Sequence, residues 1–212
     1  MAVLPYIKDA VVDTVFADPP FNLGKEYGEN CNDLKPDDEY LIWCKAWIAE
    51  CVRTLKPGGA FFLYNLPKWN VLLGVHLAEL GMAFRHWIAV EISACLPIPG
   101  RLHPSHYSLL YYTKGKPKTF RRIRTPIQTC RHCGGEVKDY GGHRGAMNPK
   151  GVNLKDVWTD IPPVLGLSDL DESSMPINYV GVFKEACKLG ETTFFESGSV
   201  ELACKRSPSH IV

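Results

Sequence analysis

Apolar and polar positions along the chain fall into blocks that predict strands and helices in alternation. Residues 11–17 form a continuous apolar run rich in β-branched side chains, which is typical of a buried parallel strand. From Asp37 to Leu55 apolar residues recur at helical spacing, with acids in the first turn, so we expect Asp37 to cap a helix there. Pro57-Gly58-Gly59 should end that helix, and residues 60–64 predict a second buried strand.

A strand, a helix and a second strand in this order predict a right-handed parallel crossover. Residues 67–80 predict another helix, and residues 84–92 and 105–115 predict two further strands. Trp43 and Trp47 share the apolar face of the first helix, so we interpret them as core residues rather than as a base-stacking platform. The pattern therefore predicts an α/β fold.

Composition sets limits on size, compartment and charge. The chain has 212 residues, 45% of them apolar, which suffices for one full core and a small appendage. The net charge is +1, so any basic surface for nucleic acid must be local. The sequence shows no apolar run of membrane-spanning length, so we expect no membrane partner. It also shows no export signal, so we expect a cytoplasmic location in which most of the eight cysteines are reduced thiols.

The first predicted strand ends in Asp18-Pro19-Pro20-Phe21. Proline lacks an N–H and has a fixed φ, so the two prolines should set a stiff turn at the carboxyl end of the strand, where open α/β sheets bind ligands. A carboxylate, outward carbonyls and an aromatic face suit an amino group on a flat ring, which needs two acceptors and a stacking surface. An ordinary strand-ending turn is the alternative interpretation.

This tetrapeptide resembles the Asp-Pro-Pro-aromatic motif of the S-adenosylmethionine-dependent amino-methyltransferases, which make N6-methyladenine or N4-methylcytosine in DNA. The resemblance implies a Rossmann-like methyltransferase sheet and catalytic roles for Asp18, Pro19, Pro20 and Phe21. An aspartate in the first place favours adenine over cytosine, for which serine is more usual. The Lys-Pro-Gly-Gly turn at 56–59 adds to the resemblance, and the order of motifs matches the class labelled beta.

A basic stretch follows the last predicted strand. Residues 114–124 contain no acid, which suits contacts to DNA phosphates, and a solvated loop is the alternative. Double-stranded DNA is the expected partner. His106, at the start of that strand, is either a pocket residue or a histidine at a strand entrance. The candidate DNA-binding residues are Lys114, Lys116, Lys118, Arg121, Arg122 and Arg124.

Two cysteines stand apart from the others. Cys130 and Cys133, followed by Gly134 and Gly135, have the spacing of half a zinc knuckle. Structural zinc usually needs four ligands and the chain has no second Cys-x-x-Cys, so a redox pair or a knuckle without metal remains an equal alternative to bound zinc. We expect residues 121–150 to form a loop-rich insert, for which the resemblance implies target recognition.

The resemblance also implies a cofactor half that binds S-adenosylmethionine. Residues 156–161 resemble the Asp-x-Trp-x-x-Ile segment before that half, and residues 191–206 resemble its glycine-rich loop. Thr192-Thr193 stand where the family has Asp-Pro, and Glu196 replaces the first glycine, which would put a carboxylate near that of the donor. The candidate cofactor-binding residues are Phe194, Ser197, Gly198, Ser199, Asp156 and Trp158.

These expectations divide the chain into three parts. Residues 1–120 would be the catalytic half of a methyltransferase domain, 121–150 the insert, and 151–212 a partial, degenerate cofactor half, because the chain stops at Val212. The first hypothesis is a site-specific, adenine-directed DNA methyltransferase of the kind found in restriction-modification. The alternatives are N4-cytosine specificity, a decayed copy that only binds DNA, and a zinc-dependent binding module built on the sheet.

Overall fold

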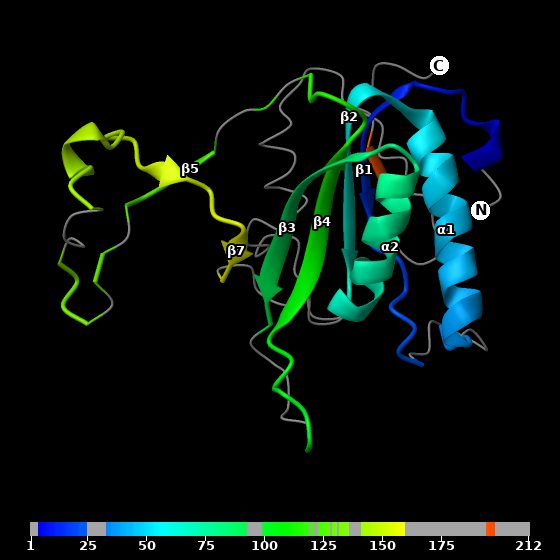
Figure 1. The fold of residues 1–212 in the computed structure, drawn as a ribbon, viewed down its shortest axis with the longest axis horizontal. Helices are drawn as coiled ribbons and strands as arrows, with labels where there is room; N and C mark the ends of the chain where they lie inside the picture. The colour runs from blue at the N-terminus through cyan, green and yellow to red at the C-terminus, as the bar shows by residue number, and fades with distance from the viewer. Residues whose placement is uncertain are drawn as a thin grey trace, which may run out of the picture.

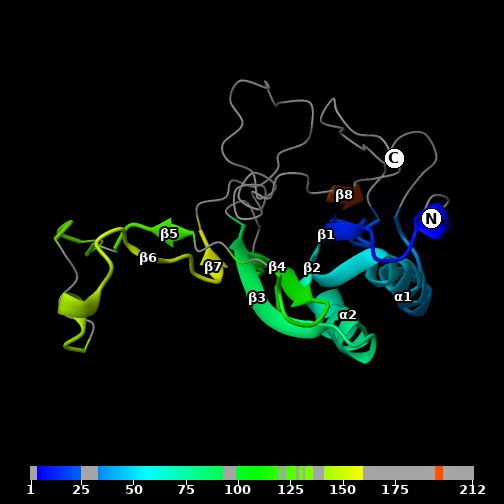
Figure 2. The same ribbon diagram turned by 90° about the horizontal axis from the view of Figure 1, so that it is seen from above.

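The computed structural model describes residues 4–24, 33–92, 99–118, 120, 123–127, 129–130, 132–135, 141–159 and 194–197. Within these residues a mixed sheet of six strands, in the order β7-β3-β4-β2-β1-β8, carries the helices α1 and α2 on one face (Figures 1 and 2). The predicted α/β class is confirmed. The elements of this layered body are β1 (Val12–Ala17), α1 (Asp37–Thr54), β2 (Leu55–Asn65), α2 (Pro67–Glu79), β3 (Ala83–Glu91), β4 (His106–Thr113), β7 (Val157–Trp158) and β8 (Phe194–Ser197).

Strand β1 lies between β2 and β8 and runs parallel to both. All of its residues except Asp13 are buried, as the continuous apolar run predicts. Val15 and Ala17 pack in the cluster shared with the two helices, whereas Phe16 packs in a second cluster on the other face of the sheet. The predicted buried strand and its parallel pairing with β2 are confirmed.

Helix α1 differs from its prediction at both ends. It begins at Asp37 itself, Pro36 precedes it, and no side chain caps its amino end, so the prediction that Asp37 is the cap is wrong by one residue. Asp37, Asp38 and Glu39 still place negative charge in the first turn, where the helix dipole favours it. The helix ends at Thr54, before the Pro-Gly-Gly sequence.

Residues 56–59 belong to an irregular start of β2. The pairing with β1 jumps from Val12–Leu55 to Thr14–Ala60, so these residues bulge out of the ladder. Gly58 has a φ of +81° and donates its N–H to the Lys114 carbonyl over 2.7 Å. A Cβ on Gly59 would lie 2.9 Å from the Lys56 carbonyl oxygen, which explains the second glycine.

The remaining elements of the sheet lie close to their predicted ranges. Strand β4 runs antiparallel to both β2 and β3, so the sheet is mixed rather than parallel throughout. Trp47 is 5% exposed and Trp43 packs against the same cluster, which confirms the core interpretation of both.

Outside the sheet the described chain forms short elements only. A 3₁₀ helix, Leu4–Tyr6, precedes β1, and a small separate sheet of β5 (Arg124–Thr125) and β6 (Val152–Asn153) projects to one side (Figures 1 and 2). A second 3₁₀ helix, Arg144–Ala146, lies between these two strands in the sequence. None of the helices in the described ranges is long and apolar enough to cross a membrane.

Candidate active site

The carboxyl ends of β1 and β2 meet the carboxyl end of β3 and the amino end of β4 at one edge of the sheet, here called the carboxyl edge. The register fixes this arrangement, since Ala17 pairs with Leu63, and Asn65 pairs with Ser108. Glu91, the last residue of β3, pairs with His106, the first residue of β4. Asp18 follows β1 directly and therefore lies at this edge.

The turn after β1 is fixed to the chain that enters α1. Asp18 is half-buried and Pro19 is buried. Asn22 is 7% exposed and holds a left-handed φ of +59°. Its Nδ2 donates to the Lys35 carbonyl over 2.9 Å, and its Oδ1 accepts from the Lys35 N–H over 2.7 Å. This pair of bonds anchors the far end of the turn.

Two buried aromatic side chains hold the carbonyls of Pro20 and Phe21. The Tyr40 hydroxyl, from the first turn of α1, donates to the Pro20 carbonyl over 2.6 Å. The Trp69 indole N–H, from the first turn of α2, donates to the Phe21 carbonyl over 3.0 Å. Asn65 supports this arrangement, because its Nδ2 donates to the Tyr40 oxygen over 3.0 Å.

These bonds go to the carbonyls of Pro20 and Phe21, and within the described ranges the carbonyl of Pro19 is left as an acceptor. Among the described residues no hydrogen bond reaches that carbonyl, and none of the three bonds from Tyr40, Trp69 and Asn65 involves the Asp18 carboxylate. Burial raises the pKa of Tyr40 far above its ordinary value, so its hydroxyl remains a neutral donor at physiological pH.

An aromatic cluster lies beside the turn. The ring centroid of Phe21 lies 5.3 Å from that of Tyr107 and 5.8 Å from that of Tyr64, with the rings tilted by 50° and 61°. Tyr64 and Tyr107 are 5.5 Å apart and also meet edge to face. Phe21 is half-buried, so the Asp18-Pro19-Pro20-Phe21 turn combines a carboxylate, an unused carbonyl and a packed aromatic ring.

A buried polar network ties the strands together under this edge. Asn70 is fully buried, and its Nδ2 donates to Ser108 Oγ over 2.7 Å and to the Ser108 carbonyl over 3.0 Å. Ser108 Oγ in turn donates to the Asn65 carbonyl over 3.0 Å. His106 is exposed at the same edge, and no contact in the described part of the chain decides between its two interpretations.

The predicted cofactor residues lie at the two outermost strands of the sheet, β8 and β7. Strand β8 lies next to β1, and Ser197 pairs with Ala17, which puts the end of β8 beside Asp18. Asp156 and Trp158 lie at β7, four strand positions from β1, or roughly 19 Å at normal strand spacing. Trp158 is 5% exposed in the second core cluster, and its indole N–H donates to the Lys155 carbonyl. Gly198 and Ser199 lie outside the described residues.

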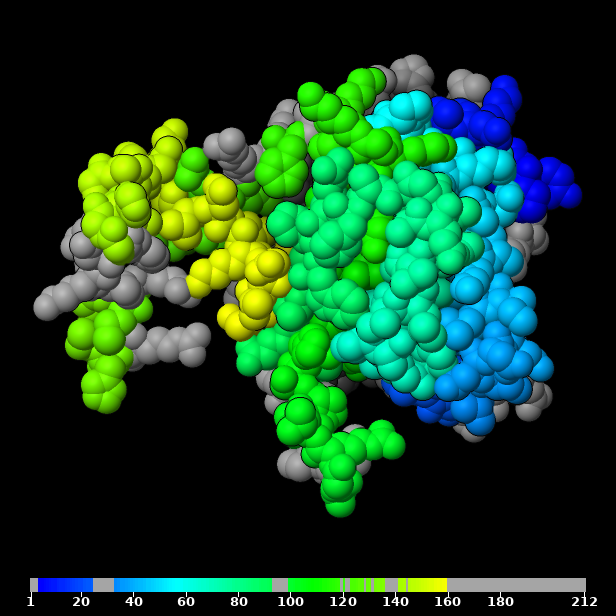
Figure 3. All heavy atoms as spheres, viewed as in Figure 1, coloured from blue at the N-terminus to red at the C-terminus, as the bar shows by residue number. Residues whose placement is uncertain are grey.

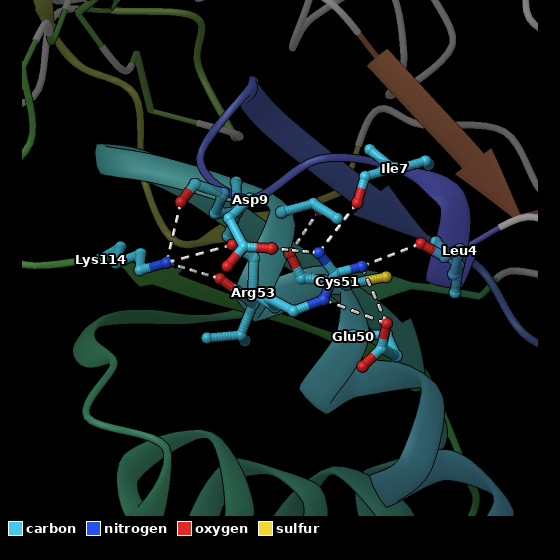
Figure 4. Close-up of polar contacts among 10 residues, drawn as sticks. Leu4, Ile7, Asp9, Glu50, Cys51, Arg53 and Lys114 are labelled. Atoms are coloured by element: carbon cyan, nitrogen blue, oxygen red, sulfur yellow. Dashed lines mark hydrogen bonds and ion pairs between the residues drawn. The ribbon is translucent and has the colours of Figure 1, made fainter.

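The predicted DNA-binding residues are not gathered at the carboxyl edge. Lys114 Nζ donates to the carbonyls of Val52 and Leu55 over 2.8 and 2.9 Å, so it caps the end of α1 (Figure 4). Because Thr113 pairs with Ala60, this cap lies at the opposite edge, about 17 Å along the strands from the level of Asp18.

The other members of that set have varied positions. Lys116 and Lys118 follow Lys114 and are exposed. Arg124 donates to the Gly151 carbonyl over 2.8 Å, which ties β5 to the end of the insert. Arg121 and Arg122 lie outside the described residues.

The structure does not support zinc at the predicted cysteine pair. Cys130 and Cys133 lie in a tight turn closed by a bond from the Gly134 N–H to the Cys130 carbonyl over 2.9 Å. Hydrogen bonds from the backbone of His132 and Cys133 lower the pKa of the Cys130 thiol. In the described part of the chain no group of three or more His, Cys, Asp or Glu side chains could hold a metal ion.

Tyr40, Trp69 and Asn22 hold the turn, and sequence reasoning missed all three. Tyr40 was counted only as an apolar position of the first helix, and Trp69 and Asn22 received no role. A signal does exist, because a buried tyrosine or tryptophan needs a partner for its O–H or N–H. Both aromatics stand in the first turn of a helix that starts from the carboxyl edge, so the Pro-Pro turn is within their reach.

Comparisons with known proteins agree with the motif. Residues 12–190 match the model of a family described as DNA methylase, N6_N4_Mtase. The chain is 57% identical over 159 residues to "Type II methyltransferase M.BamHI" of Bacillus amyloliquefaciens, covering 74% of this chain and 37% of that protein. It is 30% identical over 160 residues to "Type II methyltransferase M.HpaI" of Haemophilus parainfluenzae, covering 73% and 46%. The chain thus spans less than half the length of these relatives.

Solved structures share the fold. A protein of Thermus thermophilus named "Putative DNA Modification Methylase", solved with S-adenosyl-L-methionine, matches 93% of this chain and 75% of its own, with a TM-score of 0.55 and 15% identity. At that identity the match supports the arrangement of strands and helices and says nothing of specificity. The sheet is therefore of the type found in this methylase.

Proposed function

Because this chain belongs to the N6/N4 DNA methylase family, we propose that it is the catalytic part of a DNA amino-methyltransferase. It transfers a methyl group from S-adenosylmethionine to the exocyclic amine of a base that has been flipped out of the duplex. The observation that carries this proposal is the half-buried Asp18 beside the unused Pro19 carbonyl at the carboxyl edge. Tyr40 and Trp69 fix the two carbonyls that follow.

The geometry of the turn suggests how the amine is prepared. One N–H of the amine donates to the Asp18 carboxylate and the other to the Pro19 carbonyl, while Phe21 stacks on the ring. Two acceptors in fixed positions localise the nitrogen lone pair and point it at the incoming carbon. The new N–C bond forms as the S–C bond of the donor breaks, and the amine proton leaves through Asp18 to water.

The methyl donor is assigned to the side of β8. S-adenosylmethionine supplies the electrophilic methyl group, and Ser197 at the end of β8 is paired with Ala17, one residue before Asp18. The chain that leaves β8 therefore starts at the same edge as the turn. We retain Phe194 and Ser197 as candidate donor contacts, and Gly198 and Ser199 with them. Asp156 and Trp158 are the weaker candidates, because the Trp158 ring is packed in the core at the far side of the sheet.

Adenine N6 is the preferred target, because the motif begins with an aspartate, as in the adenine-specific members that it resembles. Two competing functions stay distinct from it: N4-cytosine methylation by the same turn, and DNA binding without transfer. Lys116, Lys118 and Arg124, with Arg121 and Arg122, remain candidate phosphate contacts. Lys114 is left out of this set because its ammonium caps α1.

Methyl transfer from labelled S-adenosylmethionine to unmethylated genomic DNA tests the proposal. We expect incorporation by the wild type and a loss of about 100-fold or more in Asp18→Ala, the size seen when one preorganised hydrogen-bonding group is removed from an active site. Asp13→Ala is the matched control, since Asp13 lies in the same strand but pairs with Lys56 at the opposite edge over 2.8 Å.

Nucleoside chromatography of the product separates the three functions. Label in N6-methyl-2′-deoxyadenosine supports the preferred target, and label in N4-methyl-2′-deoxycytidine replaces it with the second. DNA binding without label from either the wild type or Asp18→Ala would leave only the binding function.

A further inference from the structure

We propose that the loop before β4 enters duplex DNA, with Leu102 as the side chain that fills the space left by the flipped base. The loop, here called the β3–β4 tip, comprises residues 99–105 and rests on the proposed function for its substrate. Arg101 and His103, on either side of Leu102, contact the phosphates next to that space. No part of the motif or of the basic stretch includes these residues.

Its place in the fold is the first support. The tip leads into β4 at the carboxyl edge, where the N–H of Ile92, the residue after β3, donates to the Ser105 carbonyl over 2.8 Å. Strand β4 is two positions from β1 in the sheet, which puts the start of β4 roughly 10 Å from the strand that carries Asp18. The tip is thus on the side of the molecule from which a base would reach the turn.

Its exposure is the second support. Leu102 is 94% exposed, more than the other large apolar side chains of the described residues. A single exposed leucine is normal, so its value here lies in its position within a segment whose residues 99–106 are all exposed. Figure 3 shows this segment, in green, extending from the lower end of the molecule. On either side of Leu102, Gly100 allows the left-handed φ of +74° and Pro104 fixes its own φ.

The charge around Leu102 indicates which kind of partner the tip binds. All the residues from Pro99 to His106 are exposed, and they include Arg101, His103 and His106 but no acid. Glu91, paired with His106 at the base, is the acid of the described parts of β3–β4 nearest to the tip. Proteins that open duplex DNA insert apolar wedges between bases and hold the flanking phosphates with cations, which is the combination found here.

The alternative occupant is a protein surface, which would also bury Leu102. A protein partner would be stabilised by burying Leu102, but protein surfaces in general carry no fixed negative charge to match Arg101, His103 and His106. A polyanion does, because each neutralised phosphate releases counterions. The observations therefore favour DNA.

Methyl transfer with two forms of one DNA tests the wedge. For Leu102→Ala we expect the rate on duplex DNA to fall about tenfold, the size of losing one apolar contact, while the rate on the same DNA heat-denatured changes less than twofold. Single strands need no flipping, so the difference reports the wedge and not the chemistry. Val75→Ala is the matched control, since Val75 is a 57% exposed apolar residue on α2. Equal losses on both forms, or no loss on either, would overturn the wedge while leaving the proposed function intact.

A second measurement does not depend on activity. Leu102→Trp should lose fluorescence when a mixed-sequence duplex with one abasic position is added, because the indole stacks on bases, and Val75→Trp should not. Arg101→Ala should reduce the salt dependence of duplex binding by about one phosphate contact. If no variant transfers methyl groups, the proposed function fails, and the quenching decides separately whether the tip enters DNA. Equal behaviour of the two tryptophan variants, with an unchanged salt dependence, assigns the tip to another partner.

Discussion

The two ends of β1 are both surrounded by polar contacts, but the contacts are of opposite kinds. At the amino end charged side chains hold the chain together: Lys114 caps α1, and Arg53 binds the carboxylates of Asp9 and Glu50 and the carbonyls of Leu4 and Ile7 (Figure 4). At the carboxyl end neutral donors hold the turn after Asp18. At the amino end charged side chains bind backbone carbonyls. At the carboxyl end the bonds to the Pro20 and Phe21 carbonyls come from neutral donors, and the Asp33 carboxylate accepts from the Leu23 N–H over 3.1 Å.

This contrast explains how a cation-rich stretch can lie far from the place where an anion is expected to bind. Lys114 donates to the carbonyls of Val52 and Arg53 in the last turn of α1 and to that of Leu55 directly after it, so its ammonium stabilises the fold and is not available to a ligand. Neutral clamps at the carboxyl end fix Pro20 and Phe21 without placing a counter-charge against Asp18 through those same bonds. Each prediction below alters one end and asks whether the other responds.

The largest effect is expected at the carboxyl end, in Tyr40→Phe. Removing the hydroxyl leaves the Pro20 carbonyl without its partner, so the turn shifts and the catalytic constant should fall about 100-fold, as a displacement of about 1 Å can cause. The Michaelis constants should change little, because the contacts to donor and DNA remain. Initial rates over a range of DNA and donor concentrations measure both.

Tyr112→Phe is the control for that variant. Its hydroxyl is also buried and donates to a carbonyl, that of Gly74, over 3.0 Å, but far from the turn. Both variants should lose about 1–3 kcal/mol of stability, the cost of one buried carbonyl left unpaired. A similar fall in rate in both would show that Tyr40 acts through general stability alone.

The next effect belongs to the amino end. Lys114→Met removes the charged cap from α1 and should lower the free energy of unfolding by about 2 kcal/mol, a roughly 30-fold change in the unfolding equilibrium. Methyl transfer at a temperature where the variant is folded should stay within twofold of the wild type. Urea unfolding gives the first quantity. Lys45→Met, at an exposed position of α1 outside the proposed site, serves as the control and should alter neither.

A smaller effect is expected from the second clamp. Trp69→Phe keeps the ring but removes the indole N–H that holds the Phe21 carbonyl, so the catalytic constant should fall about tenfold. Trp47→Phe is the matched change, since Trp47 is also buried but its indole N–H has no partner among the described residues. A rate loss in Trp47→Phe equal to that in Trp69→Phe would contradict the role of the N–H.

The smallest effect concerns two buried thiols of α1, that of Cys44 near the middle of the helix and that of Cys51 near its carboxyl end. Burial raises the pKa of both Cys44 and Cys51 from 9.0 to about 12. A raised pKa means that the folded state keeps the proton longer, so this stabilisation is full below pH 9 and is lost as the pH rises toward 12. At pH 9.5 each thiol should already reduce the free energy of unfolding by about 1 kcal/mol.

Urea unfolding between pH 8 and pH 10 measures that loss. Cys51→Ala and Cys44→Ala should each show a shallower decline than the wild type, and the same decline in all three would refute the assignment. Alkylation of the thiols sharpens the comparison of the two ends. In Lys114→Met the labelling of Cys51 should rise more than that of Cys44. Lys114 Nζ donates to the carbonyl of Val52, the residue after Cys51 (Figure 4), whereas Cys44 stands about two helical turns before Val52 in the sequence.

Strong periodicity made much of the fold predictable from the sequence. The continuous apolar run of β1 and the helical spacing of α1 carry their own information, so their type and approximate bounds are confirmed. The helix ends within about one residue of its predicted periodicity, but the Pro-Gly-Gly sequence lies in a bulge of β2 rather than at the end of the helix. That bulge depends on Lys114, which lies more than fifty residues later.

The part of the site whose residues are consecutive in the sequence could be predicted. Asp18, Pro19, Pro20 and Phe21 lie together at the carboxyl edge. The clamps were not predictable in the same way, since Tyr40 and Trp69 reach the turn from two different helices. Lys114 shows the converse, because its basic neighbours suggested phosphate while its position beside the end of α1 determined its contacts. Side-chain roles that depend on a distant element are lost when only local composition is considered.

The two hydrogen bonds between Asn22 and Lys35 bear on which insertions and substitutions the segment between them tolerates. Two short bonds hold these residues together, and the Leu23 N–H donates to the carboxylate of Asp33 over 3.1 Å, so Leu23 and Asp33 are held at the two ends of the segment between them. Closing a loop costs only about 0.6 kcal/mol more for each doubling of its length. Loops of different length and sequence can therefore be exchanged here as cassettes, and Asn22→Ala should remove that tolerance by letting each new loop pull on the turn it adjoins.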